Sequence, residues 1–122
     1  MADPVHRYYA ALEARNWDEV EALLAPDFVY ELPQSHERVH GRENYLRFNQ
    51  DYPGEWHLAV DRVIADGDRE AAVRLTVTYE GEPMDNLSLL TFDDQQRITR
   101  MVDFWPEPSE RPSGRPDYVE RD

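Results

Sequence analysis

The sequence predicts a single α+β domain in which helices cover one face of an antiparallel sheet. In the first 50 residues, apolar side chains recur at helical spacing in three segments. From residue 56 onward they alternate with polar ones in runs separated by turn signals. Helices followed by hairpin-linked strands are typical of this fold class. The chain has 122 residues, 40% of them apolar, which is enough for one modest core.

Capping signals define where the predicted helices begin. Asp3-Pro4 offers an N-cap acceptor followed by proline at the first helical position. Asn16 with Glu19 resembles a capping box and starts the second helix, which Pro26 closes. The third helix follows Gly41. The apolar faces of the three helices comprise Val5, Tyr8, Tyr9, Leu12, Val20, Leu23, Leu24, Tyr45, Leu46 and Phe48.

Five strands are expected, the first being 28–32, which Pro33 ends before a loop over 33–41. The four longer ones are 56–64, 71–79, 87–92 and 97–105. The segment 87–92 lacks clean alternation, so its register is the least defined. Five prolines and glycines among charges follow Trp105. We therefore expect a domain over 1–107 and an extended or mobile tail over 108–122.

Composition restricts the partners and the compartment. The formal charge of −13 repels phosphate backbones, so neither nucleic acid nor an anionic membrane is an expected partner. No stretch is long and apolar enough to span a bilayer, and the N-terminus does not resemble a signal peptide. The absence of cysteine excludes disulfides and thiolate chemistry. A cytoplasmic protein is the expectation.

The last strand carries the most informative residue, Asp103. Alternate side chains of a strand point to opposite faces, so Asp103 shares a face with Met101 and Trp105. A carboxylate between apolar side chains is costly to bury without partners. Asp103 therefore lies at the surface, is paired, or works with a raised pKa.

Several motifs in order resemble ketosteroid isomerases, SnoaL-type polyketide cyclases, limonene epoxide hydrolase and the wider nuclear transport factor 2-like superfamily. They are Arg7-Tyr8, Ala25-Pro26-Asp27, Glu31-Leu32-Pro33, His40-Gly41-Arg42-Glu43, Gly81-Glu82-Pro83 and the run from Ile98 to Glu107. The resemblance covers roughly residues 5 to 107. It implies a cone-shaped fold, with a curved antiparallel or mixed sheet whose concave face, closed by three helices, forms an apolar pocket. It also implies a homodimer formed through the outer surface of the sheet.

The resemblance implies roles for individual positions, and several depart from the family patterns. The pocket tyrosine of steroid isomerases falls on Tyr8. Their catalytic base falls on Leu32, which cannot take a proton, and their protonated aspartate falls on Ser88. In steroid isomerases, that aspartic acid is kept neutral so that it can donate a hydrogen bond. Two of the three functional positions of a steroid isomerase therefore hold different residues in this sequence.

The epoxide hydrolases, by resemblance, place a catalytic aspartate at Asp103. Their other acid and their arginine fall on Ala71 and Val73, so that triad is incomplete here. Their water-holding tyrosine and asparagine fall on Val29 and Glu31. What remains is a different set of polar side chains in an otherwise apolar pocket.

The predicted catalytic residues are therefore Asp103, Tyr8 and Glu31. Asp103 and Glu31 on facing strands would form a carboxylate pair that raises one pKa, and Tyr8 would donate to developing negative charge. Alternatively, one acid faces solvent or pairs with an arginine, and Tyr8 is a core residue. The predicted substrate-binding wall comprises Val29, Leu32, Val73, Leu75, Ser88, Met101 and Trp105.

Neither a metal nor an organic cofactor is expected. The four histidines do not follow a pattern of metal ligands: His36 and His40 are four apart, but in a loop and without a third ligand. The sequence has no glycine-rich phosphate loop, dinucleotide fingerprint or nucleophile elbow.

Two functional hypotheses follow. In the first, the domain binds a small apolar, oxygen-bearing molecule and performs acid–base chemistry on it, such as isomerisation, cyclisation or hydration. In the second, it is a ligand-binding or dimerisation module without turnover, which the departures at Leu32 and Ser88 favour. The state of Asp103 discriminates: an enzyme needs it inside the pocket, unpaired and with a raised pKa.

Overall fold

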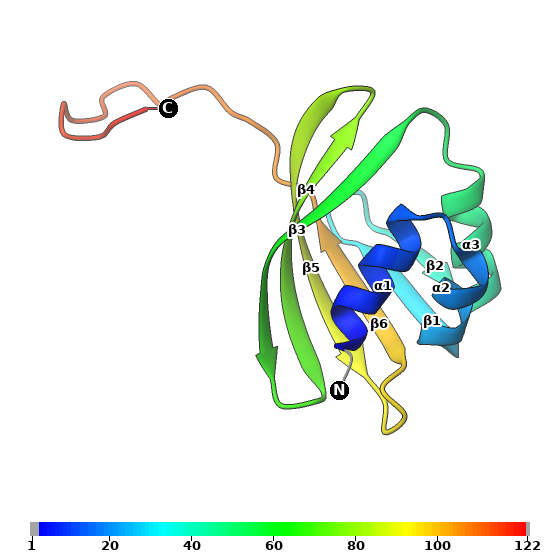
Figure 1. The fold of residues 1–122 in the computed structure, drawn as a ribbon. Helices are drawn as coiled ribbons and strands as arrows, with labels where there is room; N and C mark the ends of the chain where they lie inside the picture. The colour runs from blue at the N-terminus through cyan, green and yellow to red at the C-terminus, as the bar shows by residue number, and fades with distance from the viewer. Residues whose placement is uncertain (1–2, 122) are drawn as a thin grey trace.

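The computed structural model describes residues 3–121 and consists of three helices and a six-stranded mixed sheet. The helices are α1 (Pro4–Glu13), α2 (Trp17–Leu23) and α3 (Arg42–Gln50). The strands are β1 (Leu24–Leu32), β2 (Glu37–His40), β3 (Trp56–Asp66), β4 (Glu70–Tyr79), β5 (Glu82–Phe92) and β6 (Ile98–Phe104). The helices lie on one side of a curved sheet, as Figure 1 shows. The predicted α+β fold is confirmed.

The order of strands in the sheet brings the two ends of the domain together. The order is β2-β1-β6-β5-β4-β3. Strands β3 to β6 form an antiparallel meander, and β1 pairs with β6 in parallel. Because β1 and β6 are neighbours, side chains from the first strand and from the last strand face the same interior. This pairing places Tyr30 opposite Met101.

The predicted capping residues begin both N-terminal helices. The Asp3 side chain accepts a hydrogen bond from the Val5 N–H, at 2.8 Å, and proline occupies the first turn. The Asn16 side chain accepts from the Glu19 N–H, at 3.4 Å. These bonds satisfy amide groups that have no partner within the helix. The buried face of α1 includes Tyr8 and Tyr9.

Three strands differ from the prediction by more than two residues. Strand β2 lies within the segment 33–41, which was expected to be a loop, and forms an exposed edge next to β1. Strand β1 starts at Leu24, with a register shift against β6 between Leu24 and Val29. Pro26 lies between these two residues, within β1, and not directly at the end of α2, which it was expected to close. Strand β5 starts at Glu82, five residues earlier than expected, because it pairs with β4 up to the hairpin turn.

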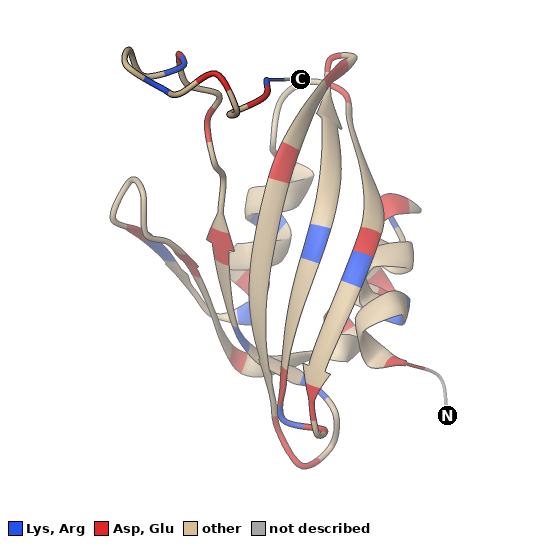
Figure 2. Cartoon of the chain, turned by 90° about the vertical axis from the view of Figure 1, so that its left-hand side faces the viewer, with Lys and Arg blue, Asp and Glu red and all other residues tan. Residues whose placement is uncertain are grey.

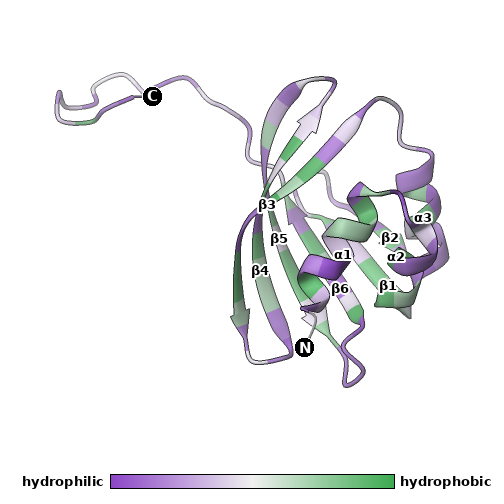
Figure 3. Cartoon of the chain, viewed as in Figure 1, coloured by the Kyte–Doolittle hydropathy of each residue, from purple (hydrophilic) through white to green (hydrophobic). Residues whose placement is uncertain are grey.

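The two sides of the sheet differ along β4 and β5. On β4, the alternation is as predicted, with Val73, Leu75 and Val77 buried. On β5, it is inverted: Asn86 and Ser88 are buried, whereas Leu87 and Leu89 are exposed on the outer side. Figure 3 shows the banded hydropathy of the strands, and Figure 2 shows charged residues at a few positions midway along the long strands. Between residues 86 and 89, strand β5 therefore presents polar groups inward and apolar groups outward, whereas Leu90 and Phe92 further along are buried apolar residues.

Residues 105–121 contain neither helix nor strand. Beyond Trp105 they are exposed and extend away from the sheet (Figure 1). The two ends of the Gln34 side-chain amide hold the Trp105 backbone at the start of this segment, with its oxygen accepting from the Trp105 N–H and its nitrogen donating to the carbonyl. Within the described residues, no helix is both long and apolar enough to cross a membrane.

Candidate functional site

A cavity of about 330 Å³ lies between the helices and the concave side of the sheet. This volume is at the lower end of the range for ligand pockets, roughly 300–1,000 Å³. Helices α1 and α3 and strands β1 and β3 to β6 all contribute to its wall. Nine of the lining residues are aromatic: Tyr8, Tyr9, Tyr30, Tyr45, Phe48, Tyr52, Trp56, Tyr79 and Trp105. The cavity is therefore suited to an apolar molecule with flat or cyclic parts.

Asp103 is the carboxylate that lines this cavity, and its side chain is only 7% exposed. The Tyr30 hydroxyl donates to Asp103 Oδ2 at 2.5 Å, and the Ser88 hydroxyl lies 2.5 Å from Oδ1. Among residues 3–121, no cationic side chain forms an ion pair with Asp103. Burial raises the pKa of Asp103 from 3.8 to about 6, although the hydrogen bonds from Ser88, Tyr30 and Asn86 act in the opposite direction.

The hydrogen bonds around Ser88 fit the neutral form of Asp103. The Ser88 hydroxyl carries a single proton, but it lies between Asp103 Oδ1 and Asn86 Oδ1, which is 2.9 Å away. The Asn86 amide nitrogen donates to the Phe104 carbonyl at 3.3 Å, which fixes the amide oxygen toward Ser88. Protonated Asp103 can donate to Ser88, which then donates to Asn86. A pKa near 6 makes this neutral form and the charged form both accessible close to neutral pH.

The tyrosine hydroxyls around Asp103 are buried and remain protonated. The Tyr8 and Tyr45 hydroxyls lie 2.6 Å apart, and the Tyr45 hydroxyl also points at Met101 Sδ, 3.8 Å away. Burial is the main cause that raises the pKa of Tyr8, Tyr9, Tyr30 and Tyr45. Each hydroxyl is therefore protonated near neutral pH and can donate a hydrogen bond.

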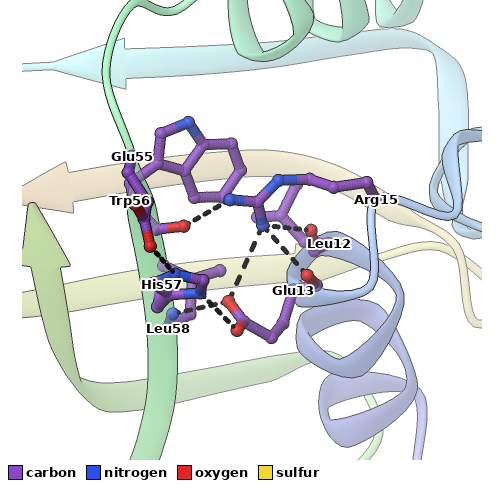
Figure 4. Close-up of polar contacts among 7 residues, drawn as sticks. All are labelled: Leu12, Glu13, Arg15, Glu55, Trp56, His57 and Leu58. Atoms are coloured by element: carbon purple, nitrogen blue, oxygen red, sulfur yellow. Dashed lines mark hydrogen bonds and ion pairs between the residues drawn. The ribbon is translucent and has the colours of Figure 1, made fainter.

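A polar cluster joins the end of α1 to the start of β3 and holds one wall of the cavity (Figure 4). Glu13 accepts from the Leu58 N–H at 2.8 Å and contacts His57 Nδ1 at 2.9 Å. The Arg15 guanidinium lies 3.4 Å above the Trp56 ring and donates to the Trp56 carbonyl. Trp56 and Leu58 both line the cavity. The cluster thus fixes the position of two lining residues.

Residues 5–101 match the model of the SnoaL-like domain. The chain belongs to the SnoaL-like domain family. A similar solved structure is a candidate ketosteroid isomerase from Kribbella flavida DSM 17836, which is 46% identical, has a TM-score of 0.93, and covers 98% of this chain and 87% of its own. No protein of curated function matches the sequence.

Two further solved structures extend the range of relatives of this SnoaL-like domain. A candidate polyketide cyclase, protein SMa1630 from Sinorhizobium meliloti, is 26% identical, with a TM-score of 0.73 and coverage of 85% of this chain and 95% of its own. An LEH-like epoxide hydrolase from M. tuberculosis is 22% identical, with a TM-score of 0.73 and coverage of 84% and 80%. At that identity, the last similarity shows the fold alone.

Most of the residues predicted for the site of the SnoaL-like domain line the cavity. They are Tyr8, Leu32, Leu75, Ser88, Met101, Asp103 and Trp105. Val73 is fully buried in the core but does not line the cavity, and Val29 is also outside the lining. The functional roles of these residues remain predictions.

The predicted pair between Asp103 and Glu31 is not formed. Glu31 lies on the opposite side of β1, and its carboxylate accepts from the Arg100 guanidinium at 2.8 Å. This hydrogen bond lowers the pKa of Glu31. The prediction was wrong for Val29 and Glu31, because Tyr30 and Leu32 point into the cavity and the residues before each of them along β1 point out.

Four buried polar residues of the cavity were not predicted as part of the site: Tyr9, Tyr30, Tyr45 and Asn86. The alternation of Phe28, Tyr30 and Leu32 against Val29 and Glu31 in β1 was the signal that could have identified Tyr30. Within the described part of the chain, no three His, Cys, Asp or Glu side chains are grouped as a metal site would require.

Proposed function

We propose that this SnoaL-like domain binds a small apolar molecule with a carbonyl or related oxygen, and that Asp103 moves a proton on it. The observation that carries the proposal is the state of Asp103: it is buried in an aromatic cavity, held by neutral donors and free of a cationic partner among the described residues. A carboxyl group whose pKa is close to the working pH can both take up and return a proton.

The proposed chemistry begins with proton abstraction next to a carbonyl group. The Asp103 carboxylate takes the proton from the carbon atom, the electron pair of that bond forms a carbon–carbon double bond, and the π electron pair of the carbonyl group moves onto its oxygen. A buried hydroxyl donor on α1 stabilises the resulting enolate. Asp103 then returns the proton to the same carbon or to another one, which gives exchange or isomerisation. The similarity to the candidate ketosteroid isomerase supports this reaction class, whereas Leu32 at the position of the usual base assigns the proton transfer to Asp103 instead.

Hydrogen–deuterium exchange tests the proposal without knowledge of the natural substrate. Cyclic ketones, from cyclohexanone and 1-tetralone to a steroid ketone, would be incubated with the protein in deuterium oxide and followed by NMR. We expect the protein to accelerate exchange at the carbon next to the carbonyl. Asp103→Asn should lower this rate by about 100-fold or more, whereas Asp85→Asn, at an exposed position of β5, should not.

Binding without exchange would favour the second hypothesis, a ligand-binding module. Melting-temperature shifts with the same ketones report binding independently of turnover, because any ligand that prefers the folded state stabilises it. Ketones that raise the melting temperature equally in the wild type and in Asp103→Asn, with no exchange in either, would contradict a catalytic role for Asp103.

We also propose that a second copy of the chain covers the outer side of the sheet. An apolar row crosses four strands there in register, comprising Ile64, Ala72, Leu89 and Val102. Ile64 is 57% exposed and Leu89 is 43% exposed. Exposed contiguous apolar surface of this kind is typical of protein–protein contacts, and the family resemblance implies a dimer formed through this surface.

Analytical ultracentrifugation tests the dimer. The wild type should sediment as a dimer, and Leu89→Lys should sediment as a monomer, because the charge would be buried in the contact. Ala10→Lys, at an exposed position of α1 on the other side of the sheet, should leave the dimer intact. A monomeric wild type would contradict the proposal.

A further inference from the structure

The Tyr9 hydroxyl differs from the other polar groups of the cavity. Tyr9 lies on α1 directly after Tyr8, lines the cavity, and is 5% exposed. Its oxygen is the one buried side-chain polar atom among the described residues that lacks a hydrogen-bond partner. Ser88 is close enough to lower the pKa of Tyr9, but the hydrogen bonds of the Ser88 hydroxyl are made with Asp103 and Asn86.

The contrast with Tyr8 defines what Tyr9 can do. The Tyr8 hydroxyl is held by Tyr45 at 2.6 Å, and that pair is completed by the Met101 sulfur. The rings of Tyr8 and Tyr9 pack edge to face, with their centroids 4.9 Å apart, so the Tyr9 ring is fixed although its hydroxyl is not. Buried polar groups in native proteins nearly always have partners, and each exception needs an explanation. Here the cavity itself is the explanation.

The surroundings of Tyr9 determine which partner fits. Burial, and then the charge of Asp103, raise the pKa of Tyr9, so its hydroxyl remains protonated and acts as a donor. Phenylalanine would fill the same space without an unsatisfied oxygen. The ligand group complementary to Tyr9 is therefore an acceptor oxygen, on the side of the cavity that also holds Asp103.

We propose that Tyr9 is the residue that receives the ligand's oxygen, and that the ligand is a neutral apolar molecule with a hydrogen-bond-accepting oxygen such as a ketone. The inference rests on the proposed function, since it concerns the same cavity. It assigns to Tyr9 the donor role for which the sequence had pointed to Tyr8. It also places the acceptor oxygen between α1 and Asp103, which leaves the neighbouring carbon close to the carboxylate.

Two matched comparisons test this proposal. The first compares the stability of Tyr9→Phe and Tyr8→Phe by urea unfolding. Tyr9→Phe should unfold at the same urea concentration as the wild type or at a higher one, because no bond within the protein is lost. Tyr8→Phe should unfold at a lower concentration, because Tyr45 loses its partner.

The second comparison uses 1-tetralone and tetralin, which share a bicyclic frame and differ in the carbonyl oxygen. The wild type should bind 1-tetralone more tightly by calorimetry or ligand-observed NMR. Tyr9→Phe should weaken binding of 1-tetralone about tenfold and leave that of tetralin unchanged.

The outcomes separate this inference from the proposed function. A clear loss of stability in Tyr9→Phe would overturn the inference, since it would mean that the hydroxyl is bonded within the protein. A wild type that does not favour 1-tetralone over tetralin, including one that binds neither, would also overturn it. Weaker ketone binding in Tyr9→Phe would support the inference even if the protein catalyses no exchange, a result that would contradict the catalytic proposal alone.

Discussion

The Tyr30 hydroxyl donates a 2.5 Å hydrogen bond to Asp103 Oδ2 across 73 positions of the sequence. The contact exists because β1 and β6 are parallel neighbours at the centre of the sheet, with Tyr30 opposite Met101. A hydroxyl donor at this distance stabilises the charged carboxylate, whereas burial destabilises it. Burial outweighs the hydrogen bonds from Ser88, Tyr30 and Asn86 and leaves the pKa of Asp103 at about 6. The bond from Tyr30 is therefore one of the contacts that determine the pH at which Asp103 gains or loses a proton.

Tyr30→Phe should raise the pKa of Asp103 above its wild-type value, because the variant loses a donor to the charged form while the carboxyl group stays buried. The NMR shift of the Asp103 carboxyl carbon, followed against pH, measures this directly. The pH profile of ketone exchange should move upward by the same amount. Tyr118→Phe, whose side chain is 85% exposed in the tail, serves as the control. An unchanged Asp103 midpoint in Tyr30→Phe would contradict the assigned hydrogen bond.

Asp103→Asn should remove a pH dependence of stability. The pKa of Asp103 rises from 3.8 to about 6 on folding, so between these values the folded protein holds a proton that the unfolded chain releases. This contribution to the free energy of unfolding is fully present below pH 3.8 and is lost as the pH rises through about 6. Its size is about 3 kcal/mol.

Urea unfolding over this pH range measures the effect. The free energy of unfolding of the wild type, minus that of Asp103→Asn, should fall by about 3 kcal/mol between pH of about 4 and about 7. The asparagine amide can donate to Ser88 as the protonated acid does, so the variant should fold. Asp85→Asn, at an exposed site, should show no such trend. A difference that stays constant with pH would mean that Asp103 does not have a raised pKa.

The sequence predicted the three helices and the long strands β3, β4 and β6 to within a few residues, and it identified Asp103, because these depend on local spacing. The N-caps Asp3 and Asn16 act within a few residues of themselves, and their bonds are present. The residues predicted on β1 came from both of its faces: Leu32 lines the cavity, whereas Val29 and Glu31 do not. A shift of one residue along a strand exchanges the side chains that point inward with those that point outward. Tyr30 was missed for that reason.

Strand β5 could not be predicted from alternation for a different physical reason. Its inward residues Asn86 and Ser88 are polar because they face Asp103, to which Ser88 is directly paired in register. Its outward residues Leu87 and Leu89 are apolar and exposed. A strand usually alternates apolar residues that point inward with polar residues that point outward. Here the site needs polar groups inside and the outer face of the sheet is apolar, so the alternation over these residues is reversed.

Glu31→Gln should leave both stability and ketone exchange close to the wild type. The Glu31 carboxylate lies outside the cavity and pairs with Arg100, whose side chain is 55% exposed. An exposed ion pair of this kind contributes about 0–1 kcal/mol. Urea unfolding and exchange rates measure both effects, with Asp103→Asn as the comparison in the same assay. A loss of exchange comparable to that of Asp103→Asn would restore the predicted role of Glu31 in the chemistry.

Glu13→Ala should loosen the wall of the cavity as well as reduce stability. Removing the carboxylate leaves the Leu58 N–H without its partner and separates α1 from His57. We expect a loss of about 1 kcal/mol in the free energy of unfolding, since Glu13 is partly exposed. Because Trp56 and Leu58 line the cavity, the affinity for 1-tetralone should fall too.

The matched control for Glu13→Ala is Glu21→Ala, which removes an exposed carboxylate from α2. It should change neither stability nor affinity.

A pH series adds a second check, because Glu55 and Glu13 raise the pKa of His57. The stabilising effect of this histidine is present at low pH and is lost as the pH rises through its raised pKa. The difference between the wild type and His57→Gln should therefore shrink toward alkaline pH, and a difference that grows there would rule out the ion pairs of Figure 4 as its source.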